Sequence, residues 1–182
     1  VAADIGRLLG ATDDKIVVTS YSADSLFREP LAPDAIERVR QRHGLAGFPF
    51  VLSVGVQQPR KNVRRLAEAF LTFKERHPRS AHRLVIAGKT GWGSRGAVTL
   101  PASPHIVAIG YVADADLPAL YGAATAFAYP SLYEGFGLPI VEAMAAGCPV
   151  LTSNRGAMAE VAADCAELVD PGSVPALAAG LE

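Results

Sequence analysis

The sequence has little of what would mark a metal or redox protein. It contains 2 cysteines, Cys148 and Cys165, which lie too far apart for a zinc or redox motif. Each stands beside an apolar run, so we expect both to be small buried hydrophobic residues. The 4 histidines are scattered, without the spacing of four residues that places two imidazoles on one helix face. The sequence therefore predicts no metal site.

The sequence also lacks an excess of one charge and any long apolar run. Its formal net charge is −1, which argues against the basic surface of a nucleic-acid-binding protein. No apolar run approaches the ~20 residues of a membrane span, and the chain begins at Val1 without a methionine or the pattern of a signal peptide. We therefore expect a soluble, cytoplasmic piece of a longer protein, for which peripheral contact with a membrane stays open.

What the sequence does contain, from residue 50 onward, is a regular alternation of short apolar runs and helix-like segments. This alternation predicts an α/β, Rossmann-like domain with a parallel sheet and helices on both faces. We assign residues 46–182 to that domain, truncated at its C-terminus, and residues 1–45 to the tail of a preceding domain and a linker. The expected strands are 15–19, 50–54, 83–87, 106–109, 124–129, 150–153 and 166–169, and the expected helices are 4–9, 34–42, 63–75, 117–121, 138–146, 157–162 and one from 174 onward.

Residues 129–147 form the most informative stretch. An apolar strand runs into a turn that holds Gly135 and Gly137, where glycine allows backbone conformations barred to other residues and leaves room for a ligand. The N–H groups at the start of the following helix would favour a phosphate. Glu134 before the turn and Glu142 in the helix would bring two carboxylates over the same pocket, where they suit sugar hydroxyls. The stretch predicts a site for a diphosphate and a sugar.

A basic pair, Arg60 and Lys61, follows the first strand of the regular pattern, with Asn62 placed to cap the next helix. Taken alone, the pair would be interpreted as solvated surface. In a parallel sheet, however, the loops after the strands meet at the carboxyl edge, where ligands bind. Cations at that edge would stabilise the charge that develops on a departing diphosphate. The pair predicts a second wall of the same site.

Three other motifs are weaker. Residues 91–96 match the dinucleotide fingerprint, but two prolines follow shortly and disfavour the helix that this motif requires. Residues 88–90 resemble the end of a P-loop, but an arginine stands where that motif requires glycine. Asp114 and Asp116 resemble the paired aspartates with which some sugar transferases hold a metal. Their place between a strand and a helix favours helix capping instead.

Together these residues resemble the C-terminal, donor-binding domain of a GT-B fold glycosyltransferase of family 4 (group 1), and within it the mannosyltransferases. The resemblance spans residues 50–171 and rests on two glutamates with seven residues between them, joined to several other blocks. Those blocks are Ser53-Val54-Gly55, Pro59-Arg60-Lys61-Asn62, Leu84-Val85-Ile86-Ala87-Gly88, Gly110-Tyr111-Val112, Pro130-Ser131, Glu134-Gly135-Phe136-Gly137, Glu142-Ala143-Met144-Ala145, Gly147, Pro149-Val150 and Glu160-Val161.

The resemblance implies transfer of a hexose, with a hint of mannose, from a GDP- or UDP-sugar with retention at the anomeric carbon. It implies no cofactor and no essential metal. The acceptor, a saccharide or a lipid-linked saccharide as in polysaccharide biosynthesis, would bind through an N-terminal domain outside this chain. Many members carry a second basic residue where this chain has Val56, so Arg60 and Lys61 would supply more of the charge that binds the diphosphate.

By the same resemblance, Glu134, Arg60 and Lys61 would be catalytic, with Glu134 near the hydroxyls of the donor sugar and the two cations on the diphosphate. Glu142 would hold the ribose hydroxyls. The base would pack near Tyr111 and Val112. The remaining donor-binding positions would be Gly55, Gly135 and the backbone amides of Phe136, Gly137 and Leu138.

Rival interpretations remain. A non-catalytic nucleotide-sugar binding module would have the same pocket, and only the preceding domain would separate it from an enzyme. An epimerase or a phosphorylase could share the fold. Glu134 and the Gly-Phe-Gly turn weigh against the epimerase, and no lysine can be singled out for a pyridoxal cofactor.

Overall fold

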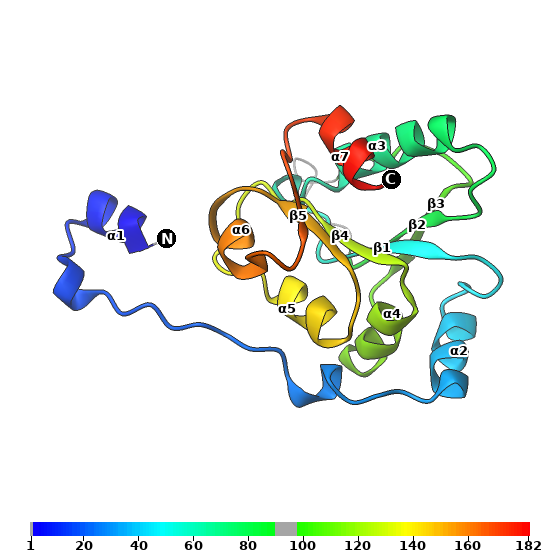
Figure 1. Ribbon diagram of the computed structural model, residues 1–182, viewed down its shortest axis with the longest axis horizontal. Coiled ribbons are helices and arrows are strands. Elements are labelled where there is room, and N and C mark those ends of the chain that lie inside the picture. The colour runs from blue at the N-terminus through cyan, green and yellow to red at the C-terminus, as the bar shows by residue number, and fades with distance from the viewer. Residues whose placement is uncertain (1, 90–97) are drawn as a thin grey trace.

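The computed structural model describes residues 2–89 and 98–182, and within them six parallel strands form one sheet in the order β3-β2-β1-β4-β5-β6 (Figure 1). The strands are short and apolar, as expected for a parallel sheet that is covered on both faces. The predicted α/β, Rossmann-like class is therefore confirmed. The strands are β1 (Phe50–Val54), β2 (Arg83–Ala87), β3 (Ile106–Gly110), β4 (Ala126–Tyr129), β5 (Val150–Ser153) and β6 (Glu167–Val169).

Two layers of helices enclose the sheet because successive strand residues point to opposite faces. Phe50 and Leu52 of β1 belong to one core, and Val51 between them belongs to the other. Helices α3 (Val63–Arg76) and α7 (Val174–Gly180) pack together over one face (Figure 1). The other face is covered by α2 (Pro33–Arg42), α4 (Leu117–Ala123), α5 (Leu138–Ala145) and α6 (Gly156–Ala162), which contact one another in sequence.

The strand order reverses between β1 and β4, which are neighbours in the sheet although two strands separate them in sequence. In sheets of this kind, ligands bind outside the carboxyl ends of the strands at such a switch point. The ends of β1 and β2 approach closely there. A Cβ on Gly88 would lie 2.0 Å from the carbonyl oxygen of Gly55, and Gly88 has a φ of +134°, so only glycine fits.

The segment before the sheet departs from the sequence prediction. Helix α1 (Ala2–Leu9) is present, but residues 16–20 pair with no described strand, so the strand predicted at 15–19 is wrong. Its valines favour extended backbone, yet a strand also needs a neighbour, and Val17 is 82% exposed. Figure 1 shows this segment lying apart from the sheet. A short helical turn, η1 (Asp13–Lys15), precedes residues 16–20, and another, η2 (Ser25–Phe27), follows them.

Two side-chain predictions also need correction. Cys148 is buried as expected, but Cys165 is exposed. Asp116, expected to cap α4, makes no capping bond there. Instead its carboxylate accepts hydrogen bonds from Arg42 (2.5 Å) and His43 (3.0 Å), which join α2 to the turn η4 (Asp114–Asp116). Burial opposes ionisation of Asp116, but these two partners hold its pKa below the usual value.

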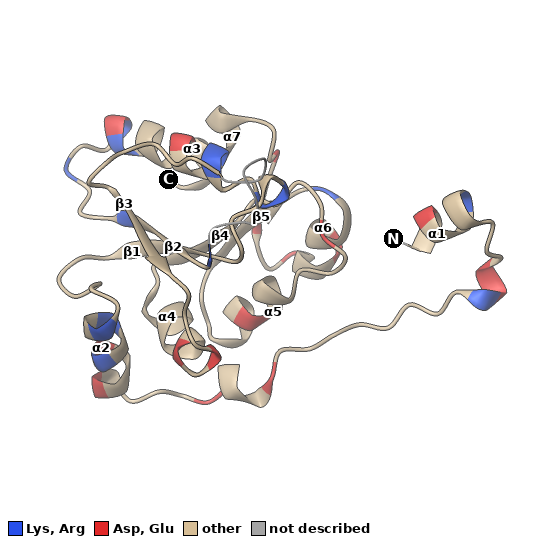
Figure 2. Ribbon diagram, turned by 180° about the vertical axis from the view of Figure 1, so that it is seen from behind, with Lys and Arg blue, Asp and Glu red and all other residues tan. Residues whose placement is uncertain are grey.

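Charges of both signs are distributed over the helices. Figure 2 shows acidic and basic positions together on α2 and on α3, in keeping with the net charge of −1. In residues 2–89 and 98–182, no helix is long and apolar enough to cross a bilayer.

Candidate functional site

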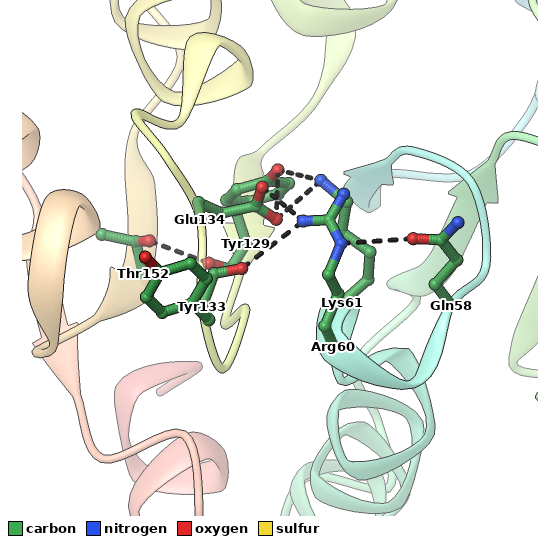
Figure 3. Close-up of polar contacts among 7 residues, drawn as sticks. All are labelled: Gln58, Arg60, Lys61, Tyr129, Tyr133, Glu134 and Thr152. Atoms are coloured by element: carbon green, nitrogen blue, oxygen red, sulfur yellow. Dashed lines mark hydrogen bonds and ion pairs between the residues drawn. The ribbon is translucent and has the colours of Figure 1, made fainter. Parts of the chain in front are cut away.

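The predicted cations and the first glutamate meet at the switch point (Figure 3). The turn η3 (Pro59–Lys61) after β1 carries both cations, and the loop after β4 carries Glu134. Arg60 Nη1 lies 2.5 Å from Glu134 Oε2, and Lys61 Nζ lies 2.7 Å from Oε1. The two loops are also joined through the backbone, since the Leu132 N–H donates to the Arg60 carbonyl at 2.7 Å. The sequence placed these residues at one edge, and the structure brings them into direct contact.

The two cations differ in exposure. The Lys61 side chain is 12% exposed, whereas that of Arg60 is 47% exposed. Burial lowers the pKa of Lys61, and the neighbouring Glu134 carboxylate counteracts this. Burial would raise the pKa of Glu134, but hydrogen bonds from Lys61 and Arg60 bring it below its usual value. Glu134 is therefore a fixed anion, with one enclosed cation and one that reaches into solvent.

Tyr129, at the end of β4, completes the cluster and is the residue that sequence reasoning missed. Its hydroxyl donates to Glu134 Oε1 at 2.9 Å and accepts a hydrogen bond from Lys61 Nζ. Its ring stacks on Phe127 with centroids 5.7 Å apart. The Thr152 hydroxyl donates to its carbonyl at 2.8 Å (Figure 3). The signal in the sequence was a single hydroxyl at the end of an otherwise apolar strand. We call Arg60, Lys61, Tyr129 and Glu134 the cation cluster.

Asn62 does not cap α3 as predicted. It has a left-handed backbone, with φ of 59°, and makes no side-chain capping bond. Instead its buried amide donates to the carbonyls of Pro130 (3.1 Å) and Pro171 (2.7 Å) and accepts from Arg65 (3.0 Å). The prediction failed because these carbonyls come from loops that are distant in sequence. Asn62 thereby holds the loop of Arg60 and Lys61 against the end of β4.

The glycine turn leads into α5 as predicted. Gly137 has φ of +105° and precedes the helix, but Gly135 has no such conformation and a Cβ on it would contact nothing within 4 Å. The expected conformational need for glycine therefore holds at 137 and is wrong at 135. The N–H groups of Phe136, Gly137 and Leu138 have no acceptor among the described residues. They are free to bind an anion at the start of the helix.

Glu142 lies on α5 in a different setting. Its Oε2 accepts a hydrogen bond from the hydroxyl of the fully buried Tyr121 at 3.1 Å. Burial raises the pKa of Glu142, the nearby charge of Asp114 adds to that, and the Tyr121 bond opposes it. The two glutamates thus have different hydrogen-bond partners in this structure, Tyr121 for Glu142 and the cation cluster for Glu134.

The remaining predicted positions lie along the same carboxyl edge. Tyr111 is 64% exposed after β3, and the Lys89 ammonium lies 5.0 Å from its ring centroid, whereas Val112 is buried. The N–H of Gly55 donates to the Ala87 carbonyl, and its φ of +138° is a backbone conformation that favours glycine. The glycine-rich fingerprint at 91–96 lies outside the described residues.

A parallel Rossmann-like sheet with cations, a glutamate and free helix amides at its switch point is the arrangement expected for one half of a GT-B glycosyltransferase. The profile of the family described as Glycosyl transferases group 1 matches residues 35–182. The chain belongs to this family.

The curated relatives include mannosyltransferases. The O-antigen chain mannosyltransferase B of Escherichia coli is 38% identical over 180 residues, covering 97% of this chain and 47% of the relative. The MMP alpha-(1->4)-mannosyltransferase of Mycolicibacterium hassiacum is 30% identical, covering 100% of this chain and 46% of the relative. The chain thus spans about half the length of these relatives.

Solved structures agree with the fold. A glycosyltransferase from Rickettsia africae superposes with a TM-score of 0.80 at 22% identity, over 98% of this chain and 49% of that one. A sucrose-phosphate synthase from Thermosynechococcus elongatus superposes with a TM-score of 0.75 at 25% identity, over 98% and 45%. The Anabaena protein Alr3699/HepE, solved in complex with UDP and glucose, superposes with a TM-score of 0.72 at 24% identity, over 91% and 45%.

Proposed function

We propose that residues 46–182 form the donor-binding domain of a retaining glycosyltransferase that moves a hexose from a nucleotide sugar to a saccharide or lipid-linked acceptor. Residues 1–45 would be the end of a preceding domain and the linker. The observation that carries the proposal is the cation cluster beside the free amides of Phe136, Gly137 and Leu138, at the switch point of the sheet. Both features suit a diphosphate joined to a sugar.

The charges suggest how the donor is held. The exposed Arg60 can turn from Glu134 toward a diphosphate, and the enclosed Lys61 contributes charge from a fixed place. As the bond between the sugar and the diphosphate breaks, negative charge grows on the leaving group. Fixed cations and amides stabilise that charge more in the transition state than in the ground state. Glu134 accepts from a sugar hydroxyl, and Glu142 accepts from the ribose.

Mannose is the sugar to test first, because two relatives that cover nearly the whole chain are named as mannosyltransferases. The base would lie against the exposed ring of Tyr111 beside Val112. The other candidate, a non-catalytic nucleotide-sugar binding module, would use the same pocket.

Calorimetry of the full-length protein that carries this chain tests the proposal. GDP, UDP, GDP-mannose and UDP-glucose would be titrated in turn, and at least one nucleotide sugar should bind. A folded protein that binds none of them would refute the assignment. Release of sugar to a glycan acceptor, with the anomeric configuration of the product read by NMR, separates a retaining enzyme from a binding module.

A further inference from the structure

We propose that Tyr129 is a positioning residue whose hydroxyl determines which oxygen of Glu134 faces the donor sugar. The inference rests on the proposed function and adds to it a residue whose own contacts are with Glu134 and Lys61. Tyr129 is 3% exposed, so it acts through these two neighbours.

The hydrogen bonds to Glu134 divide its two oxygens unequally. Oε1 accepts from the Tyr129 hydroxyl at 2.9 Å and from Lys61 at 2.7 Å. Oε2 accepts only from Arg60, at 2.5 Å, among the described residues. Each carboxylate oxygen offers about two acceptor sites. Oε1 is therefore filled, and Oε2 retains one site for a further donor such as a sugar hydroxyl.

This division persists when Arg60 moves. The Arg60 side chain is 47% exposed and can leave Glu134 for a diphosphate, which frees Oε2 completely. Tyr129 and Lys61 still hold Oε1 after that change. The carboxylate thus keeps its orientation at the moment when the donor arrives, with Oε2 open.

Tyr129 suits this task better than lysine alone because its phenol cannot swing. Its ring stacks on Phe127 within the core, the Lys61 ammonium lies 4.6 Å from its ring centroid, and its carbonyl is held by Thr152. A lysine ammonium carries three donors on a flexible stem and specifies no single direction. A group held by a packed strand positions a functional side chain more accurately.

The chain offers a matched control. Tyr121 is also buried and also donates its hydroxyl to a glutamate, Glu142, at 3.1 Å. Each tyrosine can lose its hydroxyl by a change to phenylalanine that keeps the ring. Because Glu142 is proposed for the ribose and Glu134 for the sugar, the two changes should affect different parts of the donor.

The experiment measures the affinity of the full-length protein for GDP and for GDP-mannose, with UDP and UDP-glucose as the second pair. Tyr129→Phe should leave the affinity for the nucleoside diphosphate within about twofold of that of wild type. The affinity for the sugar nucleotide should fall about tenfold relative to it, since one hydrogen bond to the charged Glu134 is lost. Tyr121→Phe should weaken both ligands by the same factor.

A pH profile gives a readout that a purely structural role would not change. The Tyr129 hydrogen bond helps to keep the pKa of Glu134 low. As the pH falls, sugar-nucleotide binding should therefore be lost at a higher pH in Tyr129→Phe than in wild type. Tyr121→Phe should leave this acid limb of the pH profile, which reports protonation of Glu134, where it is in wild type.

Each outcome decides something. A wild-type protein that binds neither sugar nucleotide would overturn both the proposed function and the role of Tyr129. If wild type binds and Tyr129→Phe keeps both its affinity ratio and its acid limb, or loses both ligands equally, only the Tyr129 proposal falls. Should Tyr129→Phe not fold, fluorotyrosine at position 129 keeps the ring and strengthens the donor, so the acid limb should move to lower pH. An unmoved limb would refute the proposal.

Discussion

The two glutamates of the site are the same residue type in opposite settings. Glu134 accepts hydrogen bonds from two cations and a phenol, and its pKa lies below the usual value of 4.5. Among the described residues, Glu142 accepts one hydrogen bond, from Tyr121, and its pKa lies above 4.5. Burial opposes ionisation at both positions, so the number of positive partners decides the direction. One carboxylate is oriented in advance, and the other keeps spare acceptor capacity for hydroxyls.

The difference arises from where the two residues lie in the fold. Glu134 stands in a loop at the switch point, opposite the turn that follows β1. Glu142 stands on α5 and faces α4. The proposed site thus has a charged part, around Glu134, and a second part, around Glu142, whose partner Tyr121 is a neutral phenol.

The largest expected effect tests the charged part. Lys61→Met in the full-length protein should reduce sugar transfer about 10²–10³-fold, because it removes a preorganised charge beside the leaving group and deprives Glu134 of a partner. The measurement is the initial rate of nucleoside diphosphate release. Arg64→Met is the control, since Arg64 is 69% exposed and, among the described residues, pairs only with Glu68. Equal losses in both variants would contradict a special role for Lys61.

Substitution of Asn62 tests whether the charged part of the site depends on hydrogen bonds between loops. Asn62→Ala should lower the free energy of unfolding by about 2–4 kcal/mol, from two lost bonds to buried carbonyls and an unfavourable left-handed backbone. Asn62→Gly relieves the backbone term and should lose about 1 kcal/mol less. Denaturant unfolding measures both. A glycine variant no more stable than the alanine variant would show that the backbone conformation costs nothing.

Glu142→Ala examines the ribose side. The affinities for GDP and GDP-mannose should fall together by about 10–100-fold, as expected for lost hydrogen bonds to a carboxylate. The KM for the acceptor should stay near wild type. Calorimetry and steady-state kinetics measure the two quantities, and a parallel loss of acceptor binding would argue against a ribose role.

The smallest effect is on stability as a function of pH. A lowered pKa stabilises the folded state above pH 4.5 and loses that contribution as the pH falls, so Glu134→Gln should cost about 1 kcal/mol at pH 7 and less near pH 4. A raised pKa of a carboxyl group has the opposite effect: it destabilises the folded state above pH 4.5. Glu142→Gln should therefore be slightly more stable than wild type at pH 7, and this gain should disappear below pH 4.5. Thermal unfolding at the two pH values measures both stability changes. If the two substitutions changed stability at pH 7 in the same direction, the two glutamates would not be in opposite settings.

Much of the fold was readable from local pattern. The predictions for β1, β2 and β5 match the observed bounds, and α5 begins at Leu138 as expected. Apolar runs and turn residues act within a few positions of the chain, so they can be recognised without the tertiary structure. The edge where Arg60, Lys61 and Glu134 meet followed from the rule that parallel strands share a carboxyl end.

The failures share a cause. The strand expected at 15–19 needed a neighbour that the sheet does not supply. Asn62 and Asp116 looked like helix caps, yet each bonds to a segment distant in sequence. Tyr129 had no predicted role of its own. In all these cases the partner, which local spacing cannot reveal, decides what the polar group does.

The sequence by itself determined the alternation of strands and helices from residue 50 onward, the glycine at 137 and the presence of two carboxylates near a helix start. Hydrophobic periodicity and backbone sterics are local, so they act wherever those residues stand. Only the tertiary structure decided that Glu134 lies among Lys61, Arg60 and Tyr129 while Glu142 meets Tyr121. Electrostatic environment depends on distances across the fold, and these exist only after the strands have assembled.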